Sequence, residues 1–489
     1  MHALGHCLPD QKSVLLQIRT QITHNSSAST KLVLWDEGAD CCGWPGLSCN
    51  FSGPVPHKVF QVPTLQTIDL SYNEMLGGSL PDFPENGSLK NLTLRGTMFS
   101  GNLPESIGNL RLLSHIDLSG CHFSGPIPAS IIKLSKLVEL SLSQNLFSGP
   151  IPASLFFLPS LQTLSLDENK FSGHMNELRN VTSPLESLVL SDNNFEGTIP
   201  SFFFRLQSLT SLHLSSNKFF GQMIDLQNVT SPLESLGLSN NNLEGTIPSF
   251  FFRLQSLTSL HLSSNKFFDQ MIDLQNVTSP LQILDLSNNN LEGTIPSFFF
   301  RLQSLTSLHL SSNNFFGQMI DLQNCLLDEK TVLLQIRSEI TYSSIRHPPS
   351  CCCGMKELTL AAGQDGNKLS GHINELQNVT SPLPLLDLSN NNLEGTIPSF
   401  FFQFQNLSTL YLAMNKFSGQ IPSFFFQLQN LTFLYLSSNK FSGEMIDLQN
   451  VTPPLEVVDL SSNNLERTIP SFFFQLQNLK TLHLSSNKI

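Results

Sequence analysis

Residues 209–217 have the sequence LTSLHLSSN, and residues 431–439 repeat the pattern as LTFLYLSSN. The motif LxxLxLxxN recurs with a constant 24-residue period from Asn73 to Asn313, and its last position is asparagine except at Thr97 and Cys121. The register then jumps from Asn313 to Asn367, where the unit is malformed, and resumes with the same period through Asn487. A fixed period of this length indicates a stacked repeat architecture of roughly sixteen or seventeen units.

Each unit has a simple physical interpretation. In LxL, strand alternation turns the two leucines inward and the residue between them outward. The final asparagine cannot be buried without a partner, so we expect this ladder residue to hydrogen-bond backbone groups of the neighbouring turn. Stacked units then form one continuous core beneath a parallel sheet. Such a sheet is a surface for contacting macromolecules, with no enclosed pocket.

The outward residues of these strands, four positions before each ladder residue, are the best candidates for ligand contact. The alternative is a solvated sheet face with no dedicated ligand. Tyr411 and Tyr435 are expected side by side as possible anchors. The candidate ligand-facing residues are Asp69, Asp117, His213, His261, Asp285, His309, Asp387, Tyr411, Tyr435, Asp459 and His483, and the other members of the row are Thr93, Ser141, Ser165, Val189 and Gly237.

Two further features of this region suggest chemistry but have plainer explanations. His261, Asp285 and His309 are expected on successive strands, where a metal clip or a pH switch is conceivable. Both histidines come from the duplicated text SLHLSSN, which favours the plainer explanation, so we predict no metal site. Cys121 stands where a ladder asparagine belongs, and we expect it to be a buried structural thiol.

Composition excludes several classes of protein. The chain of 489 residues is 40% hydrophobic and has a net charge of −12, so it offers no basic surface for nucleic acid. It contains no GxSxG, HExxH, Walker, GxGxxG, EF-hand or kinase pattern. No run of 18 apolar residues predicts a membrane helix, and the N-terminus MHALGHC lacks the apolar core of a secretory signal. We expect neither enzymatic activity nor a cofactor.

Sequons and cysteines nevertheless favour an extracellular location. Cysteines cluster near residues 7–49 and again near residues 325–353, as disulfide staples do in an oxidising compartment. Asn450 also begins a sequon, but Pro453 follows it closely. The predicted glycosylation sites are Asn25, Asn50, Asn86, Asn91, Asn180, Asn228, Asn276, Asn378, Asn406 and Asn430.

A second half-repeat, xLxGxIPxxLxxL, follows the ladder residue, as in NLFSGPIPASLFFLPSL at residues 145–161. With DCCGWPGLSC at residues 40–49, it resembles the ectodomains of plant leucine-rich-repeat receptor-like proteins and receptor-like kinases. Residues 86–128 look especially similar to receptor-like proteins of the Verticillium-wilt-resistance type. The resemblance implies an α/β leucine-rich-repeat solenoid, a curved superhelix with a concave parallel β-sheet and short helical or 3-10 segments on its convex side. It also implies disulfides Cys7–Cys41 and Cys42–Cys49 in an N-terminal cap.

We therefore expect four regions. Residues 1–52 form the N-terminal cap, and residues 53–324 form a first array of about eleven repeats. Residues 325–355 resemble residues 7–27 and are interpreted as a degenerate second cap, and residues 356–489 form a second array of five or six repeats without a C-terminal cap. We expect the array to be broken or kinked at residues 325–355. The alternative is a non-repeat island that helps bind ligand, which the position alone favours.

Six SFFF runs follow the IP dipeptide of their units. The middle phenylalanine of each occupies the Leu position of IPxxL and is expected in the core. Its neighbours are expected to be partly exposed on the convex side, as a partner surface or as an aggregation liability.

The resemblance implies ligand perception at the extracellular or plasma-membrane surface in defence or immune signalling. The ligand would be a peptide, protein or glycan, with a co-receptor kinase as a further partner. The family's membrane anchor is not present in this sequence. Two alternatives remain: a secreted protein similar to polygalacturonase inhibitors, and a non-functional gene fragment.

Overall fold

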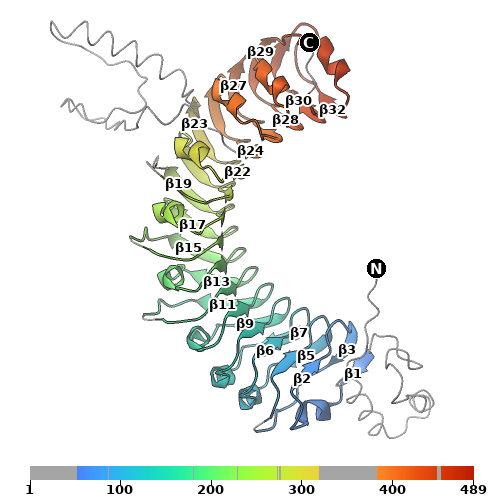
Figure 1. Cartoon of the computed structure of the whole chain (residues 1–489), viewed down its shortest axis with the longest axis vertical. Coiled ribbons are helices and arrows are strands. Elements are labelled where there is room, and N and C mark those ends of the chain that lie inside the picture. The colour runs from blue at the N-terminus through green and yellow to red at the C-terminus, as the bar shows by residue number, and fades with distance from the viewer. Residues whose placement is uncertain are drawn as a thin grey trace, which may run out of the picture. The chain divides into compact units, whose positions relative to one another are not determined.

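The computed structural model describes residues 52–85, 87–179, 181–227, 229–271, 274, 277–318, 383–448 and 453–489. The chain divides into two compact units, Met1–Asn242 and Leu243–Ile489. Each unit is a stack of repeats, and within each the strand order follows the chain (Figure 1). The even-numbered strands form one parallel sheet, called here the even-strand sheet. The odd-numbered strands form a second parallel sheet, called here the odd-strand sheet.

The even-strand sheet is built from the LxL segments. Each strand is three residues long, and its central side chain is buried in every strand except the last. The strands of the first unit are β2 (Thr67–Asp69), β4 (Asn91–Thr93), β6 (His115–Asp117), β8 (Glu139–Ser141), β10 (Thr163–Ser165), β12 (Ser187–Val189), β14 (Ser211–His213) and β16 (Ser235–Gly237). Those of the second unit are β18 (Ser259–His261), β20 (Ile283–Asp285), β22 (Ser307–His309), β24 (Leu385–Asp387), β26 (Thr409–Tyr411), β28 (Phe433–Tyr435), β30 (Val457–Asp459) and β32 (Thr481–His483).

The odd-strand sheet follows each ladder residue. In the first unit its strands are β1 (Ser52–Pro54), β3 (Met75–Gly78), β5 (Met98–Asn102), β7 (His122–Gly125), β9 (Leu146–Gly149), β11 (Lys170–His174), β13 (Asn194–Gly197) and β15 (Lys218–Gln222). The division between the units falls within β17 (Asn242–Gly245). In the second unit the strands are β19 (Lys266–Gln270), β21 (Asn290–Gly293), β23 (Asn314–Gln318), β25 (Asn392–Gly395), β27 (Lys416–Gly419), β29 (Lys440–Glu444) and β31 (Asn464–Glu466).

Five-residue 3-10 helices follow an Ile-Pro dipeptide, with Val-Pro before η2 and Leu-Pro before η3. They are η2 (His57–Gln61), η3 (Glu105–Asn109), η4 (Ala129–Lys133), η5 (Ala153–Phe157), η6 (Ser201–Arg205), η7 (Ser249–Arg253), η8 (Ser297–Arg301), η10 (Ser399–Gln403), η11 (Ser423–Gln427) and η12 (Ser471–Gln475). The described residues of alternate repeats, such as those between β11 and β12, contain no helix.

The ladder residues hold successive repeats together, as the sequence predicts. The side-chain amide of Asn217 donates to the carbonyl of Leu190 in the preceding repeat at 2.9 Å, and its oxygen accepts from the backbone of Phe195 at 3.0 Å. Cys121 takes over the bond to the preceding repeat, since its thiol donates to the Leu94 carbonyl at 3.0 Å, while the Thr97 hydroxyl donates to Leu94 within its own repeat at 2.7 Å. Cys121 is buried and free, and burial raises the pKa of its thiol.

A left-handed residue precedes the ladder position in each repeat, for example Ser216 at φ 54°. A second left-handed position follows each odd strand's apolar residue, where Gly221 has φ 83° and Gly317 has φ 88°. Asp269 occupies the second position in its own repeat at φ 71°. A side chain costs free energy in this conformation, so the replacement of glycine strains that repeat.

The expectation that the array is broken at residues 325–355 is wrong for its hydrogen-bond ladder. Strand β22 pairs directly with β24, which places His309 opposite Asp387. The backbone of Leu310 donates to the Asp387 carbonyl at 2.8 Å, and Asn391 donates to Leu310 at 3.0 Å. These bonds match those between ordinary neighbours, so no strand stands between β22 and β24. Residues 325–355 themselves lie outside the described residues.

The expected partial exposure of the SFFF runs is also wrong for three of the six. All three phenylalanines are buried in η6, η7 and η8. For η6 and η7 the reason is that the described residues of the following repeat contain no helix and leave room for phenyl rings. Phe252 reaches across such a repeat to within 5.2 Å of Phe298, measured between ring centroids. Phe402 is 44% exposed, because the next helix follows only one repeat later.

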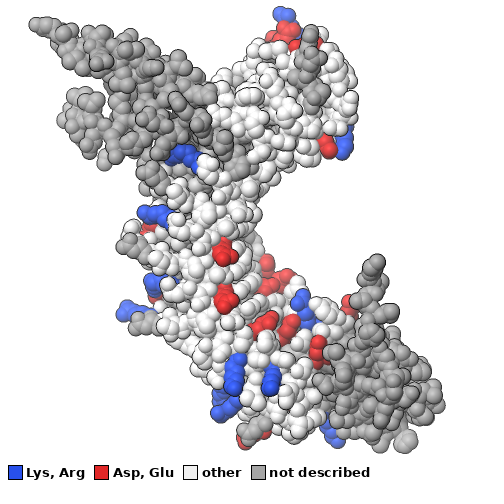
Figure 2. Space-filling model, viewed as in Figure 1, with Lys and Arg blue, Asp and Glu red and all other residues white. Residues whose placement is uncertain are grey.

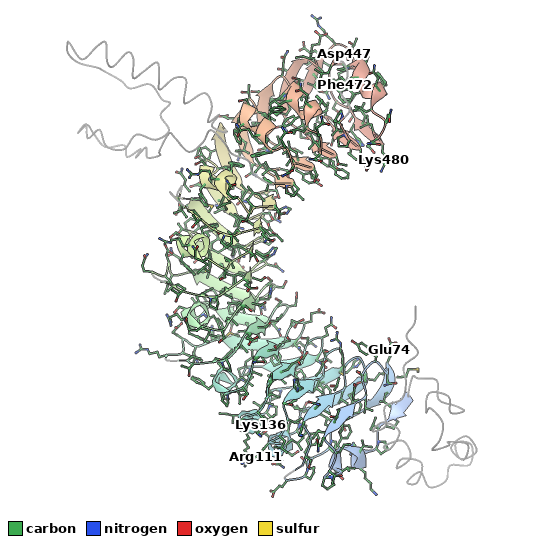
Figure 3. The ribbon with its side chains drawn as sticks, in the orientation of Figure 1. Glu74, Arg111, Lys136, Asp447, Phe472 and Lys480 are labelled. Atoms are coloured by element: carbon green, nitrogen blue, oxygen red, sulfur yellow. The ribbon has the colours of Figure 1, made fainter. Side chains whose placement is uncertain are left out.

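The helix-free repeats also supply acidic caps to the next helix. Asp447 and Phe472 lie close together in the second unit (Figure 3). Asp447 accepts from the Ser471 hydroxyl at 2.8 Å and from the Phe472 backbone at 3.2 Å. Glu177 does the same for η6 through Ser201. These bonds satisfy backbone donors that a helix start leaves unpaired.

Candidate functional site

The predicted ligand-facing residues form a continuous row within each unit, called here the outward row. In the first unit, Asp69 lies opposite Thr93, Thr93 opposite Asp117, and the pattern continues to Gly237. In the second unit, the row runs from His261 on β18 to His483 on β32. Most members are half-buried, Gly237 is buried and His483 is exposed. Each even-numbered strand therefore places one residue in the outward row, and β16 places a glycine there.

Every aspartate of the row has the same local geometry. Asp387 Oδ1 accepts from both the backbone and the hydroxyl of Ser389, at 2.9 and 2.7 Å. Asp459 makes the same pair of bonds with Ser461. This turn fixes one carboxylate oxygen and directs the carboxylate along the row. The same bonds are found at Asp69, Asp117 and Asp285.

His309 and Asp387 form an ion pair across the β22–β24 junction. Nδ1 of His309 lies 4.0 Å from Oδ2 of Asp387. The Asp387 carboxylate raises the pKa of His309 above its usual value, and burial opposes this effect. Burial would raise the pKa of Asp387, but His309 and the bonds from Ser389 lower it overall. The two residues are far apart in sequence, and only the direct pairing of the two strands brings them together.

The tyrosines of the row are stacked, as predicted. The ring centroids of Tyr411 and Tyr435 are 4.7 Å apart, and the ring planes differ by 12°. Burial, followed by the neighbouring Tyr435 and Asp387, raises the pKa of the Tyr411 phenol. On the next strand, burial would raise the pKa of Asp459, but bonds from Ser461 and the charge of His483 lower it. Both aspartates beside the tyrosines are therefore ionised at neutral pH.

Sequence reasoning missed a second outward position, two residues before each member of the row. These side chains lie on the same face and are half-buried, except for the exposed Thr67 and His115. In the first unit they are polar, and the ring Nδ1 of His115 lies 3.1 Å from the Asn91 amide oxygen. In the second unit four are apolar. The same alternation about the buried central residue predicts them, and they are Ile283, Leu385, Phe433 and Val457.

Of the predicted glycosylation sites, Asn91, Asn406 and Asn430 lie within the described residues. Asn406 and Asn430 are exposed on turns after η10 and η11. Asn91 is half-buried on the even-strand sheet, where its amide lies 3.3 Å from the Thr67 hydroxyl. A glycan there would cover the outward face of β4. The other sequons, and the disulfides predicted for Cys7, Cys41, Cys42 and Cys49, fall outside the described residues and remain predictions.

Charge, metal-ligand geometry and helix length limit what the described part of the chain can bind or cross. Acidic side chains gather on the visible face of the first unit (Figure 2). Across the described part of the chain, no group of three or more His, Cys, Asp or Glu side chains is arranged to hold a metal ion, and the histidine–aspartate row is no exception. The 3-10 helices described above are far too short to cross a bilayer.

Parallel strands, a ladder asparagine and a 24-residue period define a leucine-rich-repeat solenoid. Family models agree along the chain: "Leucine-rich repeat region" matches residues 48–277, and "Leucine rich repeat" matches residues 381–441 and 453–489. "Leucine rich repeat N-terminal domain" matches residues 8–50 and also residues 326–350. The second match falls within residues 325–355, whose interpretation as a degenerate second cap stays a prediction.

Curated relatives narrow the class to plants. Receptor-like protein 6 of Arabidopsis thaliana is 44% identical over 68 residues, 14% of this chain and 7% of that protein. Receptor-like protein 50 of the same plant is 31% identical over 135 residues, 23% of this chain and 15% of that protein. The match therefore spans a small part of each relative's length. The chain belongs to the leucine-rich-repeat family and is similar to plant receptor-like proteins.

Solved structures show the same architecture. The ectodomain of the Arabidopsis thaliana membrane receptor kinase GASSHO1/SCHENGEN3, in complex with CASPARIAN STRIP INTEGRITY FACTOR 2, has a TM-score of 0.61 and 29% identity, covering 89% of this chain and 49% of that chain. The Arabidopsis receptor kinase HAESA, in complex with the peptide hormone IDA and the co-receptor SERK1, has a TM-score of 0.54 and 27% identity, covering 98% and 86%.

Proposed function

We propose that this chain is the ligand-recognition portion of a plant cell-surface receptor-like protein and has no enzymatic activity of its own. It binds an extracellular peptide on the outward face of the even-strand sheet and signals in defence with a co-receptor kinase. The observation that carries the proposal is the outward row, which offers one half-exposed side chain per strand that the core does not use. The receptor structures bound to peptides support a peptide over a glycan.

An extracellular location is part of the proposal. The exposed sequons at Asn406 and Asn430 support it, since glycosylation needs the secretory pathway. The membrane attachment of the intact family is likewise proposed rather than observed.

The amino-acid sequence of the repeats allows the proposed binding face to be tested with added glycans. Most members of the outward row are followed by Leu-Ser, so one substitution to asparagine creates a sequon there. The substitutions His213→Asn, Asp285→Asn and Tyr435→Asn would place glycans at three points along the row. Lys133→Asn creates a sequon on η4 and is the matched control.

The full chain, secreted from plant cells, is used to select binders from a random peptide display library. We expect at least one of the three glycans on the row to abolish binding of a selected peptide. The glycan on η4 should leave binding unchanged. The proposal would be refuted if the selected peptides bound equally to all three variants with a glycan on the row, or if the library yielded no binding peptide.

A further inference from the structure

The outward row is symmetric around the stacked tyrosines. Over β22, β24, β26, β28, β30 and β32 the side chains are histidine, aspartate, tyrosine, tyrosine, aspartate and histidine. Consecutive members lie opposite one another in the strand register, from His309 and Asp387 to Asp459 and His483. The symmetry exists only because β22 pairs directly with β24.

The tyrosine stack leaves two aromatic faces available. Each ring covers one face of the other, since their centroids lie 4.7 Å apart and their planes are nearly parallel. The remaining face of Tyr411 is on the side of Asp387, and that of Tyr435 is on the side of Asp459. Each end of the stack therefore combines an aromatic face with a carboxylate.

This combination suits a guanidinium group. A planar guanidinium stacks on an aromatic face and binds a carboxylate at the same time. None of the eight even-numbered strands of the second unit carries a lysine or arginine. The face therefore presents the carboxylates of Asp285, Asp387 and Asp459 and no lysine or arginine of its own.

We propose that the row binds an extended peptide with two basic side chains, preferably arginines, four residues apart. One arginine lies over Asp387 against Tyr411, and the other lies over Asp459 against Tyr435. The two carboxylates are three strand spacings apart, about 14 Å. Four residues of extended chain span about 13 Å and return to the same face, so the spacings agree.

The proposal names the ligand class of the proposed receptor function and rests on that function. One observation favours this part of the chain. The half-buried apolar side chains of Phe433 and Val457, on adjacent strands, lie beside the row and can receive an apolar residue between the arginines.

The probe is a fluorescent peptide, Gly-Arg-Thr-Val-Thr-Arg-Gly, titrated against the full chain. One control peptide has citrulline in place of both arginines, which keeps shape and removes charge. Another has the arginines two residues apart. We expect the probe to bind at least tenfold tighter than either control, and its affinity to fall with added salt.

Matched variants localise the binding. Asp387→Ser with Asp459→Ser removes both carboxylates without creating a sequon and is expected to weaken the probe at least tenfold. Glu394→Gln with Glu466→Gln removes two charges from exposed positions of the odd-strand sheet and is expected to change affinity less than twofold. Tyr411→Phe should retain binding and Tyr411→Leu should lose it, because the aromatic face is the contact.

Equal binding of the citrulline peptide, or no effect of the aspartate pair, overturns the proposal. The library selection separates this failure from that of the receptor function. If the selected peptides lack paired basic residues but are blocked by the added glycans on the row, the receptor function stands and this inference falls. If the library yields no binder, the receptor function falls as well.

Discussion

Removing residues 325–378 is expected to leave the repeat stack intact. The deletion joins Asn324 to Val379, which restores the 24-residue spacing between Asn313 and Asn391. The joined text, MIDLQNVTSPLPLLDLSNN, differs from residues 271–289 at only two positions. The strand pairs β22–β24 and β23–β25 already exist in the full chain, so the deletion removes none of their bonds.

The expected gain in stability follows from loop closure. The connection between Gln318 and Leu383 shortens from 64 to 10 residues. If it makes no stabilising contacts, (3/2)RT ln(64/10) gives about 1.6 kcal/mol of stabilisation for the second unit. Urea unfolding and hydrogen exchange at Leu310 and Phe315 measure the effect. Deleting residues 229–282, a segment of equal length, is the control, since it breaks the register and should unfold the array.

The result that would refute this reasoning is loss of exchange protection at Leu310 and Phe315 after removal of residues 325–378. A lower urea midpoint would have the same meaning. Either outcome would show that residues 325–378 hold the two halves of the second unit together.

Three other perturbations have defined outcomes. Phe252→Ala should cost about 3–5 kcal/mol of unfolding free energy and Phe402→Ala less than about 1 kcal/mol, because only the Phe252 ring is buried. Urea denaturation of the two variants measures these costs, and equal costs would contradict the packing account. Asp269→Gly should stabilise by about 0.5 kcal/mol, since relief of the left-handed strain exceeds the added chain entropy, and a lower melting temperature would argue against it. His309→Gln should destabilise the folded state by less than about 1 kcal/mol near pH 5.5 and have no effect near pH 8. The pKa of His309 is raised in the folded state, so the stability from its protonated form is present below the unfolded-state pKa and is lost as pH rises through the folded-state pKa. A difference that grows with pH would contradict the sign.

The repeat motif predicts the parts of the fold that depend on one unit and its neighbour. The ladder bonds of Asn217 and the outward position of Tyr435 both follow from LxxLxLxxN, because strand alternation and the need to satisfy a buried amide leave no other arrangement. The stacking of Tyr411 on Tyr435 follows equally, since adjacent strands place equivalent residues side by side.

The parts that could not be predicted depend on which units become neighbours. The burial of Phe204 and Phe252 needs a helix-free repeat after each run. The sequence QMIDLQNVTSPL, which stands there in place of IPxxLxxL, indicates such a repeat but not how deeply the rings are buried. The ion pair of His309 with Asp387 needs β22 and β24 to meet although a long stretch of chain separates them. Register counting alone placed a malformed unit between those strands, because it could not show which repeats pair.

The central claim, that the outward face of the even-strand sheet receives an extracellular peptide, is tested most directly by hydroxyl-radical footprinting of the full chain with and without a selected peptide. The account predicts protection of Tyr411, Tyr435 and Phe433 on that face. Phe402 and Phe474, which are 44% and 75% exposed on 3-10 helices, should react equally in both samples. Protection of Phe402 or Phe474, with no change at the two tyrosines, would contradict it.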